Sequence, residues 1–277
     1  MSKTTLESLF NLRGLAVAIT GGGGVLCSAM AAALGDLGCK VAILDLMTES
    51  GEKTAKSIRE SGGVAIGVQC DVLKRDSVQA AAEKVAAEFG AVDVLINGAG
   101  GNKKEATATE SLRFFDLPDS ALRWVFELNC IGTMLPSQVF GRSMADRKSG
   151  QIINISSMNA FRPLTRIAAY SAAKAAVSNF TQWLAVHMAQ EYSPEIRVNA
   201  LAPGFFLTEQ NRFLLTEQAT GKLTARGQKV IDHTPAGKFG APADLVGGLV
   251  WLLSPSAKFV TGVVVPIDGG FAAYAGV

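Results

Sequence analysis

Short apolar runs alternate with longer segments of helical length along nearly the whole chain. The runs that we predict to be strands are residues 15–20, 41–44, 64–68, 92–96, 151–155, 196–201 and 263–265. The runs are largely apolar rather than alternating, which is typical of parallel strands whose two faces are both covered. Segments such as 25–37, 77–89 and 175–191 have helical length and lie between the runs. The alternation predicts an α/β fold of the Rossmann type: one doubly wound parallel sheet of about seven strands, with helices on both faces and the carboxyl ends of the strands along one edge.

Size and charge limit the classes of protein to consider. The 277 residues contain no internal repeat and no linker rich in proline or serine, so we expect a single domain over residues 1–277. Lys and Arg total 26 against 24 Asp and Glu, a balance that gives no sign of a nucleic-acid or membrane-surface partner. Residues 14–35 are uncharged, but the four glycines at 21–24 would break a membrane-spanning helix. The N-terminus does not read as a cleavable leader, and we expect a cytoplasmic protein.

Cysteines and histidines are few and scattered. The four cysteines, Cys27, Cys39, Cys70 and Cys130, form no CxxC pair, and each lies in or beside an apolar stretch. We therefore expect them to be buried, reduced residues. With only two histidines in the chain, we expect no metal site.

Residues 208–235 interrupt the alternation. The segment is polar, carries several basic residues and contains no clear strand. A long excursion near the end of an α/β domain is more often a cover over the ligand site than a structural element. We expect a substrate lid at about 208–235.

The first predicted strand runs directly into a glycine cluster, Thr20 followed by 21–24. Glycines at this point let backbone N–H groups approach a pyrophosphate, and the N-terminus of the next helix adds about half a positive charge. The second predicted strand ends at Asp45, whose carboxylate can accept hydrogen bonds from the adenosine ribose and would repel the 2′-phosphate of NADP. These features predict NAD as the cofactor, although Asp45 could instead be a solvated carboxylate that caps the following loop.

Tyr170 and Lys174 lie four residues apart at the start of an alanine-rich helix, so their side chains share one face. A nearby ammonium favours the phenolate and lowers the tyrosine pKa toward the range of useful proton exchange. The strand at 151–155 ends just before Ser156 and Ser157, and a serine at this edge can hydrogen-bond a substrate carbonyl or alcohol. Taken alone, the tyrosine and lysine could be a surface pair, and the serines could simply end the strand.

These pieces occur in the order and spacing of the short-chain dehydrogenase/reductase family, which the chain resembles from about residue 12 to 271. The matching motifs are Thr20-Gly21, Asp71-Val72, Asn97-Gly-Ala-Gly100, Asn129, Ser157, Tyr170-Ser-Ala-Ala-Lys174, Asn199-Ala-Leu-Ala-Pro-Gly204 with Thr208, and Asp268-Gly-Gly270. Each motif is common by itself, but the complete ordered series is specific. The resemblance implies an oxidoreductase with a nicotinamide cofactor.

The resemblance also implies a role for each matching residue. Tyr170 would act as acid and base, Lys174 would lower the tyrosine pKa and bind the nicotinamide ribose, and Ser157 would hold the reacting oxygen. Asn129 would support a proton relay through water and Lys174. The implied cofactor-binding residues are Gly21, Gly23, Gly24, Val25, Leu26, Asp45, Asp71, Val72, Asn97, Ala99, Gly100, Tyr170, Lys174, Pro203, Gly204, Phe206 and Thr208. Of these, Asp71 and Val72 would contact the adenine, and the last four would contact the nicotinamide end.

The glycine cluster departs from the family pattern at two positions. The family usually carries glycine five and seven residues after the threonine, where this chain has Val25 and Cys27. Gly23 and Gly24 would supply the turn instead. The fold survives this change, whereas the conformation of the loop and the strength of pyrophosphate binding depend on it.

The segment after the catalytic serine suggests the class of substrate. Ser157 is expected to share substrate binding with Asn159 and Arg162, and Arg212 in the lid is a further candidate. Arginine can bind a carboxylate through two hydrogen bonds, and polar neighbours suit a hydroxylated substrate. Many of the basic residues in this region could equally face water.

Two longer stretches resemble a narrower group within the family, the D-mannonate oxidoreductases or fructuronate reductases. These stretches are residues 156–165 and 203–212. The implied function in carbohydrate metabolism is the NAD(H)-dependent interconversion of D-fructuronate and D-mannonate. A related sugar-acid or polyol dehydrogenase, similar to gluconate 5-dehydrogenase, would share the catalytic residues, and a non-catalytic NAD-binding sensor is a second class. The family also implies a homotetramer.

Overall fold

The computed structural model describes residues 6–208, 212, 215–217 and 220–276. Its strands are β1 (Ala16–Thr20), β2 (Lys40–Asp45), β3 (Val64–Gln69), β4 (Val94–Asn97), β5 (Gly150–Ile155), β6 (Ile196–Pro203) and β7 (Val264–Ile267). The α-helices are α1 (Leu6–Leu9), α2 (Val25–Asp36), α3 (Thr48–Glu60), α4 (Arg75–Phe89), α5 (Asp119–Phe126), α6 (Gly132–Arg147), α7 (Ala168–Glu191), α9 (Ala225–Asp232) and α10 (Asp244–Leu253). Short helical turns are η1 (Lys104–Ala106), η2 (Phe114–Asp116), η4 (Met158–Ala160) and η5 (Pro255–Ala257), and η3 (Glu127–Ile131) is a π-helix.

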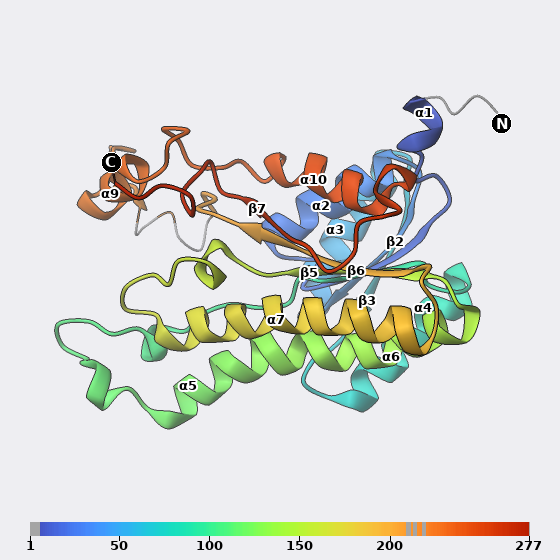
Figure 1. Ribbon diagram of the computed structural model, residues 1–277, viewed down its shortest axis with the longest axis horizontal. Helices are drawn as coiled ribbons and strands as arrows, with labels where there is room; N and C mark the ends of the chain where they lie inside the picture. The colour runs from blue at the N-terminus through green and yellow to red at the C-terminus, as the bar shows by residue number, and fades with distance from the viewer. Residues whose placement is uncertain (1–5, 209–211, 213–214, 218–219, 277) are drawn as a thin grey trace.

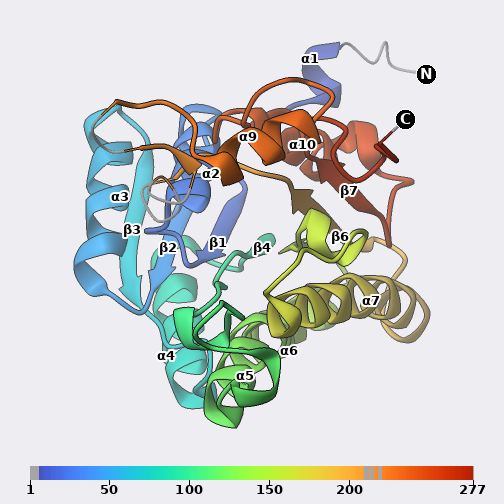
Figure 2. The same cartoon turned by 90° about the vertical axis from the view of Figure 1, so that its left-hand side faces the viewer.

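The strands form one parallel sheet in the order β3-β2-β1-β4-β5-β6-β7. Strands β1 to β3 are added toward one edge of the sheet and β4 to β7 toward the other, so the strand order reverses between β1 and β4. At such a point a doubly wound sheet opens a crevice for a ligand. The sheet and its two helical layers are seen in Figure 1 and, turned by a right angle, in Figure 2. The Rossmann-type fold predicted from the sequence is confirmed.

Two apolar clusters cover the two faces of the sheet. On one face, α2, α3 and α10 pack against side chains such as Val17 and Ile19. On the other face, α4, α6 and α7 pack against side chains such as Ala18 and Leu95. Because successive residues of a strand point to opposite faces, a strand covered on both sides is apolar at most positions. This explains the largely apolar runs of the sequence.

The predicted strand ends differ from the observed ends by at most two residues. The main difference among the helices is α7, which begins at Ala168, seven residues before the predicted segment 175–191. Alanine-rich sequence has a high helix propensity, and the whole stretch from Ala168 continues the helix. All four cysteines are buried, as predicted.

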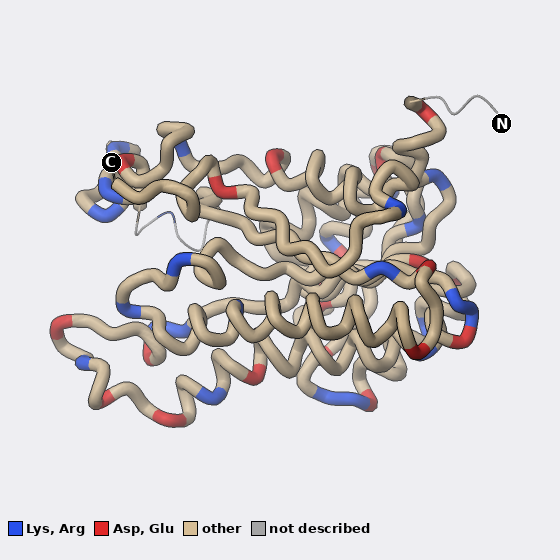
Figure 3. The backbone as a smooth tube through the Cα atoms, viewed as in Figure 1, with Lys and Arg blue, Asp and Glu red and all other residues tan. Residues whose placement is uncertain are grey.

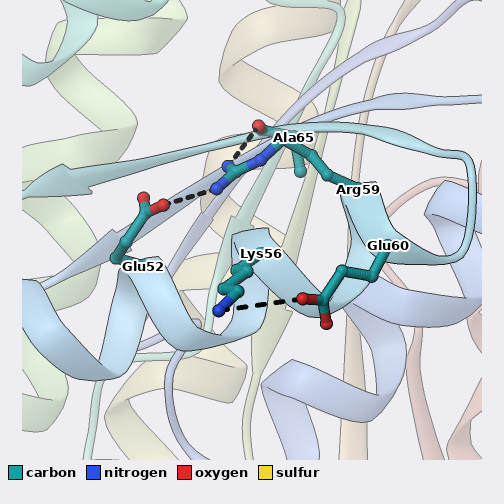
Figure 4. A network of polar contacts seen from close by, with 5 residues as sticks. All are labelled: Glu52, Lys56, Arg59, Glu60 and Ala65. Atoms are coloured by element: carbon teal, nitrogen blue, oxygen red, sulfur yellow. Dashed lines mark hydrogen bonds and ion pairs between the residues drawn. The ribbon is translucent and has the colours of Figure 1, made fainter.

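Charged residues occur mainly on the outer helices and loops (Figure 3). One polar cluster fastens the edge strand β3 to α3 (Figure 4). Arg59 donates one hydrogen bond to the carbonyl oxygen of Ala65 over 2.9 Å and forms an ion pair with Glu52. Lys56 and Glu60 form a looser pair, 3.7 Å apart, one turn along the same helix. Each exposed ion pair of this kind contributes little to the stability of the fold. The hydrogen bond from the Arg59 side chain to the carbonyl oxygen of Ala65 joins α3 to β3.

The expected lid, 208–235, is partly outside the described residues, which omit 209–211, 213–214 and 218–219. Its described part contains α9, capped by the hydroxyl of Thr224, which accepts the N–H of Gly227. A single antiparallel bridge joins Thr216 to Leu223. The C-terminal segment and α9 lie together at the carboxyl-end edge of the sheet (Figures 1 and 2).

Candidate active site

Ser157 and Tyr170 come from consecutive elements and meet at the carboxyl end of β5. Ser157 caps the short turn η4, and its Oγ accepts the N–H of Asn159 over 3.2 Å. Burial raises the pKa of Tyr170, and the side chain of Ser157 lies near enough to the phenol to oppose that shift. The two hydroxyls are therefore held side by side where a substrate oxygen could contact both.

Lys174 lies one helical turn after Tyr170 and is 4% exposed. Its Nζ donates to the carbonyl oxygen of Ile155 over 2.7 Å and lies 5.7 Å from the centre of the tyrosine ring. Burial lowers the pKa of Lys174 to about 8. At neutral pH the amine still carries its proton, so its charge can favour the phenolate form of Tyr170.

Asn129 is fully buried in the π-helix η3. Its Nδ2 donates to the carbonyl oxygens of Val125 and Gly101, both over 2.7 Å, and its Oδ1 accepts the N–H of Gly101 over 3.1 Å. A Cβ on Gly100 would lie 2.7 Å from that Oδ1 and 3.2 Å from Nζ of Lys174. Asn129 and Lys174 thus flank one glycine, and the structure brings the four predicted catalytic residues together. π-Helical turns of this kind are frequent at functional sites.

The glycine cluster forms the turn between β1 and α2. Thr20 Oγ1 accepts the N–H groups of Gly98 and Ala99 over 3.1 and 3.2 Å, which joins this turn to the loop after β4. Gly21 has a φ of +63°, a conformation that favours glycine. Gly24 is the N-cap residue of α2 and makes no side-chain cap. The uncapped N-terminus offers N–H groups to an anion, so this turn fits a pyrophosphate.

Asp45 lies beside the same turn. Its Oδ2 accepts the N–H of Gly23 and its Oδ1 accepts the N–H of Met47, each over 3.0 Å. A carboxylate oxygen can accept more than one hydrogen bond, so Asp45 can also bind ribose hydroxyls. Asp45 therefore caps the loop, as the alternative interpretation predicts, and capping leaves it able to bind the ribose hydroxyls. The residues present fit a dinucleotide at this edge of the sheet.

The two residues expected at the adenine lie after β3. Asp71 Oδ1 accepts the N–H of Leu73, and its Oδ2 is 3.3 Å from Nζ of Lys74. Val72 is 6% exposed and packs beside Gly132. Both residues are fixed by their surroundings, and their contact with a cofactor stays a prediction.

Asn97 has its side chain inside the protein, and its contact with a cofactor stays a prediction. The residue is 1% exposed, and its Nδ2 donates to Ser137 Oγ and to Asn154 Oδ1, both over 2.9 Å. Asn154 in turn donates to Thr181 Oγ1. Asn97 therefore joins β4 and β5 to α6 and α7 through a buried polar network. Sequence reasoning missed this network, although a polar residue at the end of an apolar strand run was a visible signal.

The residues expected at the nicotinamide end follow β6. A Cβ on Gly204 would lie 2.6 Å from Cα of Asp268, so this loop runs directly against the C-terminal segment. Phe206 is 4% exposed and packs against Gly240. Thr208 accepts, through its carbonyl oxygen, the N–H of Arg212 over 2.8 Å. The side chain of Phe206 is thus largely part of the core.

Two of the expected substrate residues already have protein partners. Arg162 donates its Nε–H to the carbonyl oxygen of Ala272 over 3.0 Å, which ties the loop after β5 to the C-terminal segment. Asn159 accepts the N–H of Leu164 over 2.9 Å and the hydroxyl of Ser171 over 3.4 Å. Asn159 also lines a largely apolar cavity of about 580 Å³ between η2, η4 and the start of α7. Asn159 therefore shapes the loop that carries Ser157, whatever else it binds.

Neither a metal site nor a membrane span is found in the described part of the chain. Among these residues no three His, Cys, Asp or Glu side chains cluster in a way that could hold a metal ion. None of the described helices is both long and apolar enough to cross a bilayer.

Comparison with known proteins is consistent with this geometry. A family model described as short chain dehydrogenase matches residues 15–219. An uncharacterized oxidoreductase of Bacillus subtilis, UxuB, is 50% identical over 96% of this chain and 98% of its own length. The 5-keto-D-gluconate 5-reductase of Escherichia coli is 32% identical over 96% of this chain and 98% of its own length.

Two solved structures are similar over nearly their whole length. A candidate D-mannonate oxidoreductase from Haemophilus influenza with bound NAD has a TM-score of 0.91 and 45% identity, covering 99% of this chain and 100% of that one. A gluconate 5-dehydrogenase from Burkholderia cenocepacia, in complex with NADP and tartrate, has a TM-score of 0.87 and 30% identity, covering 98% and 100%. The chain belongs to the short-chain dehydrogenase family and is an NAD(P)-dependent oxidoreductase that acts on CH–OH groups.

Proposed function

We propose that the chain interconverts D-fructuronate and D-mannonate with NAD(H). The contact between Ser157, Tyr170 and Lys174 at the end of β5 carries the reaction type. The choice of substrate is supported by the 45% identity with the candidate D-mannonate oxidoreductase. The basic side chains near the same edge are compatible with an acidic sugar.

The side chains have distinct roles in this reaction. The bound dinucleotide supplies or accepts the hydride. Tyr170 gives its hydroxyl proton to the substrate oxygen during reduction and recovers it during oxidation, while Ser157 holds the same oxygen. Lys174 stabilises the phenolate, and Asn129 holds the backbone of Gly101 that borders the site. Asp45 favours NAD(H), because its negative charge opposes a 2′-phosphate.

Arg162 is the best-supported partner for the substrate carboxylate. Its Nε–H is bound to Ala272, which fixes one edge of the planar guanidinium. The terminal N–H groups form the other edges, and such a fork suits a carboxylate. Arg212 is the alternative partner and lies within the expected lid at about 208–235. Basic residues occur along the segments around this edge (Figure 3).

The assembly state is also part of the proposal. We expect a homotetramer, with exposed apolar side chains as part of its contacts. Trp183 on α7 is 57% exposed and Trp251 on α10 is 37% exposed, and both belong to helices whose other side packs on the sheet. Sedimentation or light scattering of the purified protein measures this directly.

The test of the function is the fall in NADH absorbance with D-fructuronate, measured beside 5-keto-D-gluconate and uncharged keto sugars. We expect rapid turnover with D-fructuronate, and a loss of about a hundredfold or more in kcat for Tyr170→Phe with NADH binding retained. Arg162→Ala should raise the KM for the acid substrate without changing NADH affinity. Turnover of uncharged ketones in preference to D-fructuronate would refute the substrate proposed here.

A second candidate activity is the reduction of 5-keto-D-gluconate. It is favoured by the 32% identity with the Escherichia coli reductase named for that substrate. This substrate also carries a carboxylate, so the same assay separates the two by the ratio of kcat/KM values. A sensor without catalysis would bind NADH and turn over none of these substrates.

A further inference from the structure

Cys27 and Gly98 make a close contact between the two loops that open the crevice. Cys27 lies in the first turn of α2 and is 5% exposed. Gly98 is the first residue after β4. A Cβ on Gly98 would lie only 2.2 Å from Sγ of Cys27 and 2.8 Å from the carbonyl oxygen of Thr20. The thiol therefore occupies the space that a side chain at position 98 would need.

This contact is one of three that lock the loops together. Thr20 Oγ1 accepts the N–H groups of Gly98 and Ala99. A Cβ on Gly21 would lie 2.8 Å from Cα of Ala99, so the two backbones are also in direct contact. The Thr20 hydroxyl and the backbone of Gly21 hold the loop after β4 through Gly98 and Ala99. The Cys27 thiol packs against Gly98 of the same loop. The position of this loop then depends on the size of residue 27.

The same loop leads to the catalytic residues. Gly100 follows Gly98 by two residues and fits between Oδ1 of Asn129 and Nζ of Lys174. The Cys27 thiol lies near enough to Lys174 that each group affects the pKa of the other. Burial raises the pKa of the Cys27 thiol to about 12, so the group stays neutral and acts through its volume.

We propose that Cys27 is a positioning residue of the cofactor site, which supports Gly98 and thereby sets where Gly100 stands relative to Asn129 and Lys174. Glycine at position 98 and cysteine at position 27 are then a matched pair. The side chain at 27 fills the volume that the absence of a side chain at 98 leaves open. This inference rests on the proposed binding of a dinucleotide in the crevice.

The test is a double-mutant cycle on the whole protein, with Cys27→Gly, Gly98→Ala and the two combined. NADH affinity is measured from the change in its fluorescence, together with the pH profile of kcat/KM. We expect Cys27→Gly to weaken NADH binding about tenfold and to shift the pH profile. We expect the penalty of Gly98→Ala to be about tenfold smaller in the Cys27→Gly background than in the wild type, because loss of the thiol relieves the closer of the two clashes, while the contact with the carbonyl oxygen of Thr20 is common to both backgrounds.

Cys39→Ala is the matched control. Cys39 is also a buried cysteine, 1% exposed, but it lies before β2 and bonds to the carbonyl oxygen of Leu12, at the opposite end of the strand. The substitution Cys39→Ala should lower the unfolding temperature and leave NADH affinity unchanged. Equal penalties for Gly98→Ala in both backgrounds, or wild-type affinity and pH profile in Cys27→Gly, would overturn the inference alone. Absence of NADH binding by the wild-type protein would overturn the cofactor assignment and the inference with it.

Discussion

Burial of the Lys174 amine predicts a specific dependence of stability on pH. Its pKa is about 8 in the folded protein, lowered from 10.5 by burial. The unfolded chain therefore keeps the proton up to a higher pH than the native chain does. By linkage, the free energy of unfolding rises with pH between these two values, and the cost of burying the charge is present in full below about pH 8. That full cost is about 3 kcal/mol, since one pKa unit corresponds to about 1.4 kcal/mol.

Lys174→Met removes this titration while keeping a long apolar side chain. Between about pH 7.5 and about pH 9.5, the wild type should gain about 2 kcal/mol of unfolding free energy relative to the variant. The hydrogen bond from Nζ to Ile155 does not contribute to this difference, because a neutral amine still donates. Other titrating groups are common to both proteins and cancel in the comparison.

The measurement is urea unfolding of the cofactor-free proteins at the two pH values and at one protein concentration, with Lys84→Met as control. Lys84 is an exposed lysine on α4, so Lys84→Met makes the same side-chain change without removing a buried amine. A difference between wild type and Lys174→Met that stays constant with pH would refute the reasoning. A difference of opposite sign would mean that the amine is more stable charged inside the protein than in water.

Three further predictions follow from single contacts. Asp45→Ser should raise kcat/KM for NADPH by about tenfold and lower it for NADH, because it removes the charge that opposes the 2′-phosphate; steady-state kinetics with both cofactors would contradict the assignment if neither value moved. Gly227→Ala places a Cβ 2.1 Å from the carbonyl oxygen of Leu215 and should raise the substrate KM without changing NADH affinity, whereas Gly247→Ala, with no atom within 4 Å, should leave both unchanged. Arg197→Met removes donors to Leu252, Val260 and Gln151 and should cost about 3 kcal/mol, read as a lower urea midpoint; an unchanged midpoint would show that water replaces these bonds.

The sequence predicted which residue types form the site better than it predicted which partners their side chains bind. Tyr170 and Lys174 share a helical face by spacing alone, and their contact with Ser157 follows from the edge at which parallel strands end. Asn97 shows where this reasoning stops. Its motif implied a cofactor contact, which stays a prediction, and nothing local in the sequence indicates that its amide donates to Ser137 on α6 and to Asn154 on the neighbouring strand β5.

Arg162 likewise has a partner that the local sequence does not indicate. Its place in the loop after the catalytic serine suggested a substrate ligand, and nothing in the local sequence indicates that its Nε–H bonds to Ala272, 110 residues away. The partner at the C-terminus exists only because β7 returns that segment to the same edge of the sheet.

The parallel sheet, the loop with its glycines and the pair of Tyr170 and Lys174 on one helix can be predicted from the amino-acid sequence, because each depends on a period or a conformation that is local in the chain. Three contacts become visible only in the folded chain: Cys27 packs against Gly98, Gly100 lies between Asn129 and Lys174, and the C-terminal segment binds Arg162. These contacts join residues far apart in sequence, and their distances depend on strand order and on the packing of side chains in a close-packed interior. A pattern of residue types indicates local periods and conformations, but it does not indicate contacts between residues far apart in the sequence.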